Sequence, residues 1–126
     1  MLSEDTDIHT SQTGRAAEDK ALEHLLCAGL REITRNFHCR RGEIDLIMLD
    51  KKVVVFVEVR ARLNCSVLHP LESIDRNKVN KIILTSKYFI QSNRKYQSSN
   101  CRYDVVCLTG PVDSANIEWI KNAFDA

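Results

Sequence analysis

The chain has 126 residues, a formal net charge of +1 and 44% hydrophobic content. This length predicts one domain, and the longest apolar run, residues 53–57, is far shorter than the roughly 20 residues that cross a bilayer. The near-neutral balance gives no sign of a uniformly basic nucleic-acid binder, so the distribution of charge carries more information than its sum.

The N-terminal segment and the cysteines indicate the compartment. Residues 1–12 are acidic and polar, whereas a signal peptide would be basic and then apolar. We therefore expect a disordered lead over 1–12, followed by a single domain over 13–126. Five scattered cysteines, none in a C-x-x-C pair, argue against a zinc site and a disulfide framework. These features predict a cytoplasmic protein with reduced thiols.

The hydrophobic pattern predicts two helices and at least four strands. Apolar residues at helical spacing favour a helix over 14–27, which Gly29 would end, and a second helix after Asp75, which has the chemistry of an N-cap. The segments with strand character are 31–37, 43–49, 53–60 and 102–109; 63–74 is a loop, and 116–124 closes the domain as a strand or helix. This order predicts an α/β fold in which two helices cover a mixed sheet.

The predicted hairpin of 43–49 and 53–60 carries acids where a buried sheet would carry apolar residues. Alternation puts Glu58 and Arg60 on one face of the second strand, where that face changes from apolar to ionic. If the hairpin loop holds an even number of residues, positions summing to 103 are paired, and Asp45 lies opposite Glu58 with Cβ atoms about 4.5–5.5 Å apart. An odd loop would place Asp45 on the other face.

Two adjacent carboxylates repel each other, and a shared divalent cation would remove that cost. Oxygen ligands completed by water suit Mg²⁺ or Mn²⁺. Glu18 is a third candidate ligand because it lies in the apolar stripe of the first helix, although a first-turn acid also favours the helix macrodipole. The alternative to a metal site is a buried salt bridge to Arg60, Arg62 or Lys20.

The segment from Arg76 to Arg102 holds seven basic residues and no acidic one. Such a segment is either a solvated helix face or a surface that binds phosphates. Arg60, two residues after Glu58, would hold a phosphate oxygen beside the metal or simply neutralise Glu58.

Five stretches of the chain resemble a known family. They are TGRAAEDKAL (13–22), RRGEIDLIM (40–48), VFVEVRAR (55–62), CRYDVVCLTG (101–110) and IEWIKNAF (117–124). An acid on one strand, a turn, and Glu-x-Lys on the next strand is typical of the PD-(D/E)XK nuclease superfamily. More closely, the chain resembles the YraN family of small bacterial proteins, which are predicted to be similar to Holliday-junction resolvases.

The resemblance implies a restriction-endonuclease-like α-β-β-β-α-β core. It also implies that Glu18, Asp45 and Glu58 bind the metal and form the catalytic site together with Arg60. Arg60 stands where the superfamily usually has lysine, and arginine keeps its proton near neutral pH, so it would clamp a phosphate and not act as a general base. The residues expected to bind nucleic acid are Arg40, Arg41, Arg62, Lys78 and Lys81.

These observations lead to one main hypothesis about function and two rivals. The main hypothesis is a Mg²⁺-dependent (or Mn²⁺-dependent) endonuclease-like hydrolase that cuts phosphodiester bonds in DNA, with branched or structured DNA as candidate substrates. Action on a two-fold symmetric junction would call for a homodimer. The first rival is a catalytically silent nucleic-acid-binding module of the same fold. The second is an interaction protein whose acids form only an ion-pair network.

Overall fold

The computed structural model describes residues 12–63 and 74–126. The elements in chain order are α1 (Gln12–Cys27), β1 (Arg31–Cys39), β2 (Gly42–Asp50), β3 (Val53–Arg62), α2 (Arg76–Ser92), the 3₁₀ turn η2 (Arg94–Tyr96), β4 (Cys101–Thr109), the 3₁₀ turn η3 (Val112–Ser114) and β5 (Asn116–Phe124). The expected disordered lead and most of the expected loop over 63–74 lie outside the described residues. In the described part, no helix is both long and apolar enough to span a membrane.

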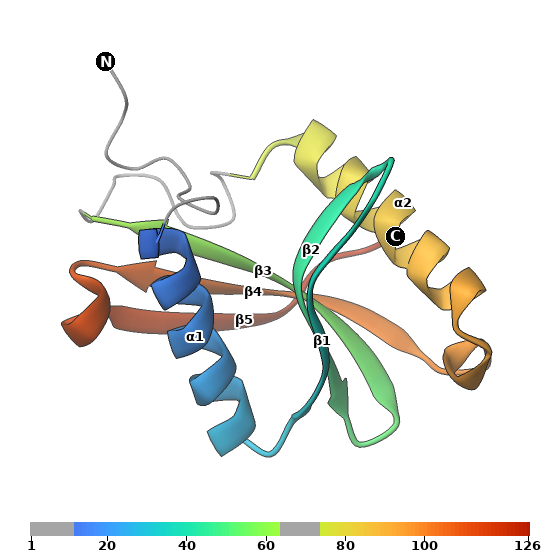
Figure 1. Ribbon diagram of the computed structural model, residues 1–126, viewed down its shortest axis with the longest axis horizontal. Coiled ribbons are helices and arrows are strands. Elements are labelled where there is room, and N and C mark those ends of the chain that lie inside the picture. Colours follow the sequence, from blue (N-terminus) through green and yellow to red (C-terminus); the bar gives the residue numbers. More distant parts are fainter. Residues whose placement is uncertain (1–11, 64–73) are drawn as a thin grey trace.

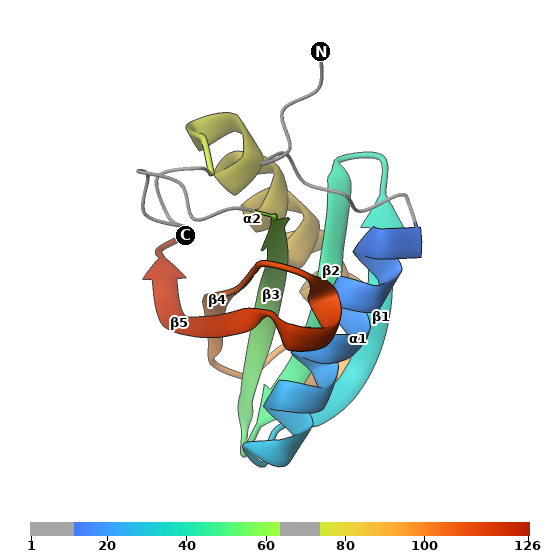
Figure 2. The ribbon, with the colours of Figure 1, turned by 90° about the vertical axis from the view of Figure 1, so that its left-hand side faces the viewer.

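The five strands form one mixed sheet in the order β1-β2-β3-β4-β5 (Figure 1). Only β3 and β4 run parallel, joined through α2, and the other neighbours are antiparallel. Figure 2 shows α1 in front of the sheet and α2 behind it. The predicted α/β architecture, a mixed sheet flanked by two helices, is therefore confirmed. The closing segment, left open between strand and helix, is the edge strand β5.

Strand β3 is the centre of the core because both of its faces are covered. Val55, Val57 and Val59 pack with the α1 side, and Val54 and Phe56 pack with the α2 side. All five are at most 1% exposed. Burial of one such side chain is worth about 1.5–3 kcal/mol, so the Val-rich sequence is what makes β3 a central strand.

Local sequence signals fix the ends of the elements. Gly29 follows α1 with φ 101°, a left-handed conformation that glycine adopts without steric cost. The Asp75 side chain accepts a hydrogen bond from the Lys78 backbone N at 2.8 Å, as predicted for an N-cap. Pairing of β2 with β3 runs from Asp50↔Val53 to Leu46↔Val57, so the loop is the two residues 51–52 and the predicted register is confirmed.

A buried carboxylate holds β4 to its neighbours. Asp104 is fully buried and accepts hydrogen bonds from Arg102 Nε at 3.0 Å, from Trp119 Nε1 at 2.9 Å and from the Asn122 backbone N at 2.9 Å. Arg102 also reaches Asp50 on β2 at 2.8 Å. Burial disfavours the charge of Arg102, but the hydrogen bonds to Asp104 and Asp50 outweigh this and raise its pKa. Arg102 therefore serves the fold, although sequence reasoning grouped it with phosphate-binding residues.

The β1–β2 hairpin has an irregularity between Glu32 and Thr34 and, near its tip, a change of facing at a bend. Before the bend, Arg35 pairs with Leu46, and Leu46 packs on the α1 side; after it, Phe37 pairs with Ile44, and both pack on the α2 side. Strict alternation would keep these residues on one face. Asn36 lies at the bend with φ 52°, a left-handed conformation that asparagine tolerates. The bend carries the hairpin tip toward α2, beside which it lies in Figure 1.

Candidate active site

The candidate site lies where β2 separates from β3. The β2–β3 pairs end at Leu46↔Val57, and the next residue of β2 is Asp45. Its carboxylate accepts a hydrogen bond from the Val59 backbone N at 2.8 Å, taking the place of a strand partner. The Asp45 side chain is also hydrogen-bonded to the Glu58 side chain. The two side chains thus meet just beyond the last β2–β3 pair, although the direct Asp45↔Glu58 strand pair that the sequence predicted is not formed, and both residues are only 3% exposed.

The environment of Asp45 favours its protonated form. Burial raises its pKa from 3.8 to about 7, and the negative charge of Glu18 adds to the rise. The Val59 amide, the hydrogen bond with Glu58 and the positive charge of Lys78 act in the opposite direction but do not cancel the effect of burial. Near neutral pH a substantial fraction of Asp45 is therefore protonated, and such shifted buried acids are common in catalytic sites.

Two cations flank Glu58. Arg60 Nη1 lies 3.7 Å from Glu58 Oε2 on the same strand, and Lys78 Nζ of α2 lies 3.4 Å from the same oxygen. Arg60 is 8% exposed, so this cluster is largely shielded from water. The Lys78–Glu58 pair was missed in the sequence, where Lys78 was assigned to nucleic-acid binding. No local pattern predicts it, because it depends on how α2 crosses the sheet.

Glu18 approaches the acid pair from α1. It is 2% exposed, and its carboxylate lies 3.8 Å from Arg35 Nη2. Arg35 also binds Asp19 at 2.8 Å, so the arginine joins β1 to α1. Glu18 is close enough to Asp45 to influence its pKa. Its contribution to the site is therefore at least electrostatic, whether or not a metal ion is bound.

The basic residues predicted to bind nucleic acid fall into two groups. Arg40 and Arg41 form the exposed turn between β1 and β2, and Lys81 is exposed on α2. Lys78 is partly buried beside Glu58, and Arg62 is only 6% exposed on the α2 side of β3. Arg40, Arg41 and Lys81 therefore have the accessibility that a phosphate contact needs, and Arg62 belongs to the interior of the sheet.

Comparison with known proteins places the chain in a family. The sequence profile of the uncharacterised protein family UPF0102 matches residues 17–108, a range that includes Glu18, Asp45, Glu58, Arg60 and Lys78. The chain belongs to the UPF0102 family. This confirms the resemblance to YraN proteins, for which UPF0102 is the family description.

Curated UPF0102 relatives match the chain over nearly its full length. A UPF0102 protein of Stutzerimonas stutzeri strain A1501 is 44% identical over 117 residues, which cover 93% of this chain and 98% of the relative. A UPF0102 protein of Pseudomonas fluorescens strain Pf0-1 is 47% identical over 115 residues, covering 91% and 94%. The names of these relatives state the family and no activity, so function has to be argued from the site.

The chemistry of the donor set decides whether a metal ion fits this UPF0102 site. Two buried carboxylates in contact supply hard oxygen ligands, and Mg²⁺ commonly takes one or two carboxylates and completes its shell with water and phosphate oxygens. Within 12–63 and 74–126, no group of three or more His, Cys, Asp or Glu side chains is arranged to hold a metal ion. The donor set fits Mg²⁺ or Mn²⁺ through Asp45 and Glu58, with Glu18 acting on the pair through its charge.

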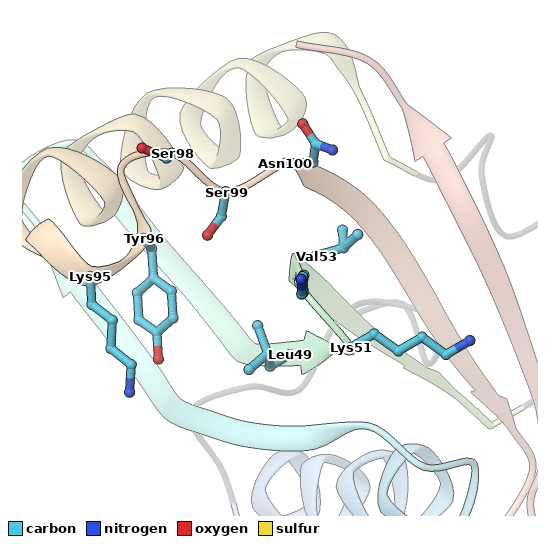
Figure 3. Close-up of a pocket in the computed structure, with 9 residues that line it drawn as sticks. Leu49, Lys51, Val53, Lys95, Tyr96, Ser98, Ser99 and Asn100 are labelled. Carbon is cyan, nitrogen blue, oxygen red and sulfur yellow. The ribbon is translucent and has the colours of Figure 1, made fainter.

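A basic depression lies at the loop end of the β2–β3 hairpin, opposite to the end that carries the acid pair (Figure 3). It encloses about 410 Å³, and its lining includes Lys51, Lys52, Lys95, Tyr96 and Ser99. It borders the Asp50↔Val53 end of the hairpin, four residue pairs away from Leu46↔Val57, where the acid pair begins. Its lysines form a basic surface remote from the candidate site, so their substitution can serve as a control for the basic residues predicted to bind nucleic acid.

Proposed function

We propose that this UPF0102 protein is a metal-dependent endonuclease-like enzyme that hydrolyses phosphodiester bonds in DNA, with branched or structured DNA as candidate substrates. The observation that carries the proposal is the contact between Asp45 and Glu58 at the separation of β2 and β3, with two cations beside it. Adjacent buried acids next to positive charges cost folding free energy, and groups with strongly shifted pKa values cluster at functional sites.

The residues of the site would have different roles in the proposed reaction. Asp45 and Glu58 would hold Mg²⁺ or Mn²⁺, which when bound polarises a phosphate oxygen and lowers the pKa of a ligated water. Arg60 keeps its charge at all relevant pH values and would hold a phosphate oxygen as charge develops on it. Of the two cations that pair with Glu58, Lys78 is the one whose ammonium can transfer a proton. Arg40, Arg41 and Lys81 would hold the DNA backbone.

A specific observation also favours the silent nucleic-acid-binding module. Arg60 and Lys78 already neutralise Glu58, and Asp45 holds a proton near neutral pH. The site is therefore close to charge balance without a cation. The two candidates make different predictions about metal binding and about cleavage.

Cleavage is tested by incubating the pure protein with single-stranded, duplex and four-way-junction DNA in Mg²⁺ or Mn²⁺. The wild type is expected to cut at least one of these, and Asp45→Asn or Glu58→Gln to lower the rate by at least about a hundredfold. The matched control is Glu32→Gln, which removes an exposed acid from β1. Cleavage that survives in both site variants would contradict the proposal, since the activity would then come from elsewhere.

Metal binding is tested separately by thermal unfolding with and without Mn²⁺. A cation that binds only the folded protein stabilises it by about 2.7 kcal/mol at a hundred times its dissociation constant, so the melting temperature of the wild type should rise. Asp45→Asn and Glu58→Gln should abolish the rise, and Glu32→Gln should leave it intact. If the melting temperature of the wild type does not rise with Mn²⁺ and no DNA is cleaved, but DNA is still bound, the result favours the silent nucleic-acid-binding module.

A further inference from the structure

A groove lies between the tip of the β1–β2 hairpin and α2, a few residues before Asp45 in the sequence. Two adjoining hollows of about 450 Å³ each share His38, Cys39, Arg40 and Arg41. One hollow is completed by Tyr88, and the other by Gly42, Glu43 and Lys81. We call the two together the hairpin groove. Its lining carries three cationic side chains against one acid, so its potential is positive.

The hairpin tip is seated directly on α2. Gly42 has φ 153°, and a Cβ added there would lie 3.1 Å from Thr85 Oγ1 and 3.3 Å from Lys81 Cβ. Thr85 is fully buried beneath the tip, and its hydroxyl donates to the Lys81 backbone O at 2.7 Å. Only glycine allows this approach. The two arginines of the turn are therefore held at a fixed position relative to α2.

Tyr88 gives the groove an aromatic wall. It is 48% exposed on the same face of α2 that meets the hairpin tip. Its ring lies 6.3 Å from that of Phe37, and Phe37 in turn makes an edge contact with Phe89 at 5.2 Å. The core thus fixes the position of the Tyr88 ring while nearly half of the residue stays open to solvent.

The groove continues to the acid pair along α2. Lys78, Lys81 and Tyr88 follow one another at spacings of three and seven residues, which places them on one helix face. At 1.5 Å per residue, Lys78 and Tyr88 are about 15 Å apart along the helix axis. Because Lys78 lies 3.4 Å from Glu58, a strand lying in the groove would be led to the candidate active site.

We propose that the hairpin groove binds an unpaired nucleotide segment, with a base stacked on Tyr88 and phosphates held by Arg40, Arg41 and Lys81. In a duplex, each base is stacked between its neighbours and offers no free face, so Tyr88 can stack only on an unpaired base. The substrate is then DNA with a single-stranded segment, such as a flap or a splayed junction arm. The inference rests on the proposed function for DNA as the ligand, but not for its cleavage.

The test measures binding of the full-length protein in EDTA, so that no metal-dependent cleavage intervenes. Fluorescein-labelled oligo(dT) and a duplex of equal length are titrated by fluorescence anisotropy. The wild type should bind the single strand at least tenfold more tightly than the duplex. Tyr88→Leu should weaken single-strand binding by about tenfold and leave duplex binding unchanged, and Tyr88→Phe should bind as the wild type does.

Charge is tested against a matched surface. The double variant Arg40→Ala/Arg41→Ala should weaken binding of both ligands and reduce its dependence on salt, because two phosphate contacts are lost. The control Lys51→Ala/Lys95→Ala removes two cations from the depression of Figure 3 and should leave the preference for single strands unchanged. If the control weakens binding as much as the arginine variant does, general basicity explains the result and the groove proposal is wrong.

Three further outcomes distinguish this inference from the proposed enzyme activity and from a different nucleic acid as ligand. Equal single-strand affinity in Tyr88→Leu and the wild type would overturn the stacking site, whatever the cleavage assay gives. Binding that depends on Tyr88, without metal-dependent cleavage, would support the groove proposal and contradict the proposed nuclease activity. Tighter binding of an RNA of the same sequence would support the groove and overturn DNA as the substrate.

Discussion

Replacing Asp104 with asparagine is expected to lower the free energy of unfolding by about 3 kcal/mol, because breaking a buried ion pair from one side typically costs about 3–5 kcal/mol and the shape is retained. The change leaves Arg102 without a charged partner on β4. It also replaces one of the two acceptor oxygens by an N–H₂ donor, which then faces either Trp119 Nε1 (at the Oδ2 position) or the Asn122 backbone N–H (at the Oδ1 position). Urea unfolding at pH 7 measures the effect.

Two controls show whether the loss comes from this network. Asp113→Asn, which alters an exposed acid in η3, should leave stability within about 0.5 kcal/mol of the wild type. Trp119→Phe removes one of the donors and should cost about 1 kcal/mol. A loss below about 1 kcal/mol for Asp104→Asn would mean that solvent or repacking replaces the network, and its structural importance would be refuted.

Asp45→Asn should change the free energy of unfolding in the opposite direction, because it should stabilise the metal-free protein at alkaline pH. The folded-state pKa of Asp45, about 7, exceeds the ordinary value of 3.8 mainly because of burial. Between these values the unfolded chain releases the proton and the folded protein retains it, so stability falls as the pH rises. Asparagine keeps an acceptor for the Val59 amide and has no charge to desolvate. At pH 8 the gain should be on the order of 4 kcal/mol.

The pH dependence of the gain is the decisive measurement. Unfolding of the wild type and of Asp45→Asn, followed in EDTA at several pH values, should give similar stabilities below about pH 4 and a difference that grows up to about pH 7. Glu18, Glu58 and Lys78 act on Asp45 from three elements, and all of them are unchanged in the variant. A constant difference across this range would show that Asp45 is ionised throughout. The stabilisation also ensures that lost cleavage in this variant is not caused by unfolding.

The fold and the acid pair could be predicted from the sequence because they depend on short-range rules. The apolar run marked β3 as a strand with one face in the core, and an even hairpin loop predicted the register that brings Asp45 near Glu58. Asp75 and Gly29 ended their helices by local chemistry. Each of these features is decided within about ten residues, where backbone geometry leaves few alternatives.

What could not be predicted depends on the packing of distant elements. The Lys78–Glu58 pair could be predicted only by knowing where α2 crosses the sheet. The burial of Arg62 could be predicted only by knowing how completely β3 is covered. Arg102 lies in a basic stretch of sequence, yet its partners Asp50 and Asp104 are brought to it by the sheet. The bend at Asn36 changes which face of the sheet the side chains of β1 and β2 occupy, and an alternating sequence pattern does not predict this change.

The bond between the Asp45 carboxylate and the Val59 amide has a consequence for judging which UPF0102 proteins are enzymes. Because this side chain closes a gap in the sheet, folding alone selects for aspartate or asparagine at the position, even in a descendant that no longer turns over substrate. Survival of that aspartate is therefore weak grounds for assigning activity. Under the proposed function, a change to asparagine there, accompanied by an intact hairpin tip and Tyr88, would mark a paralogue expected to bind nucleic acid without cleaving it.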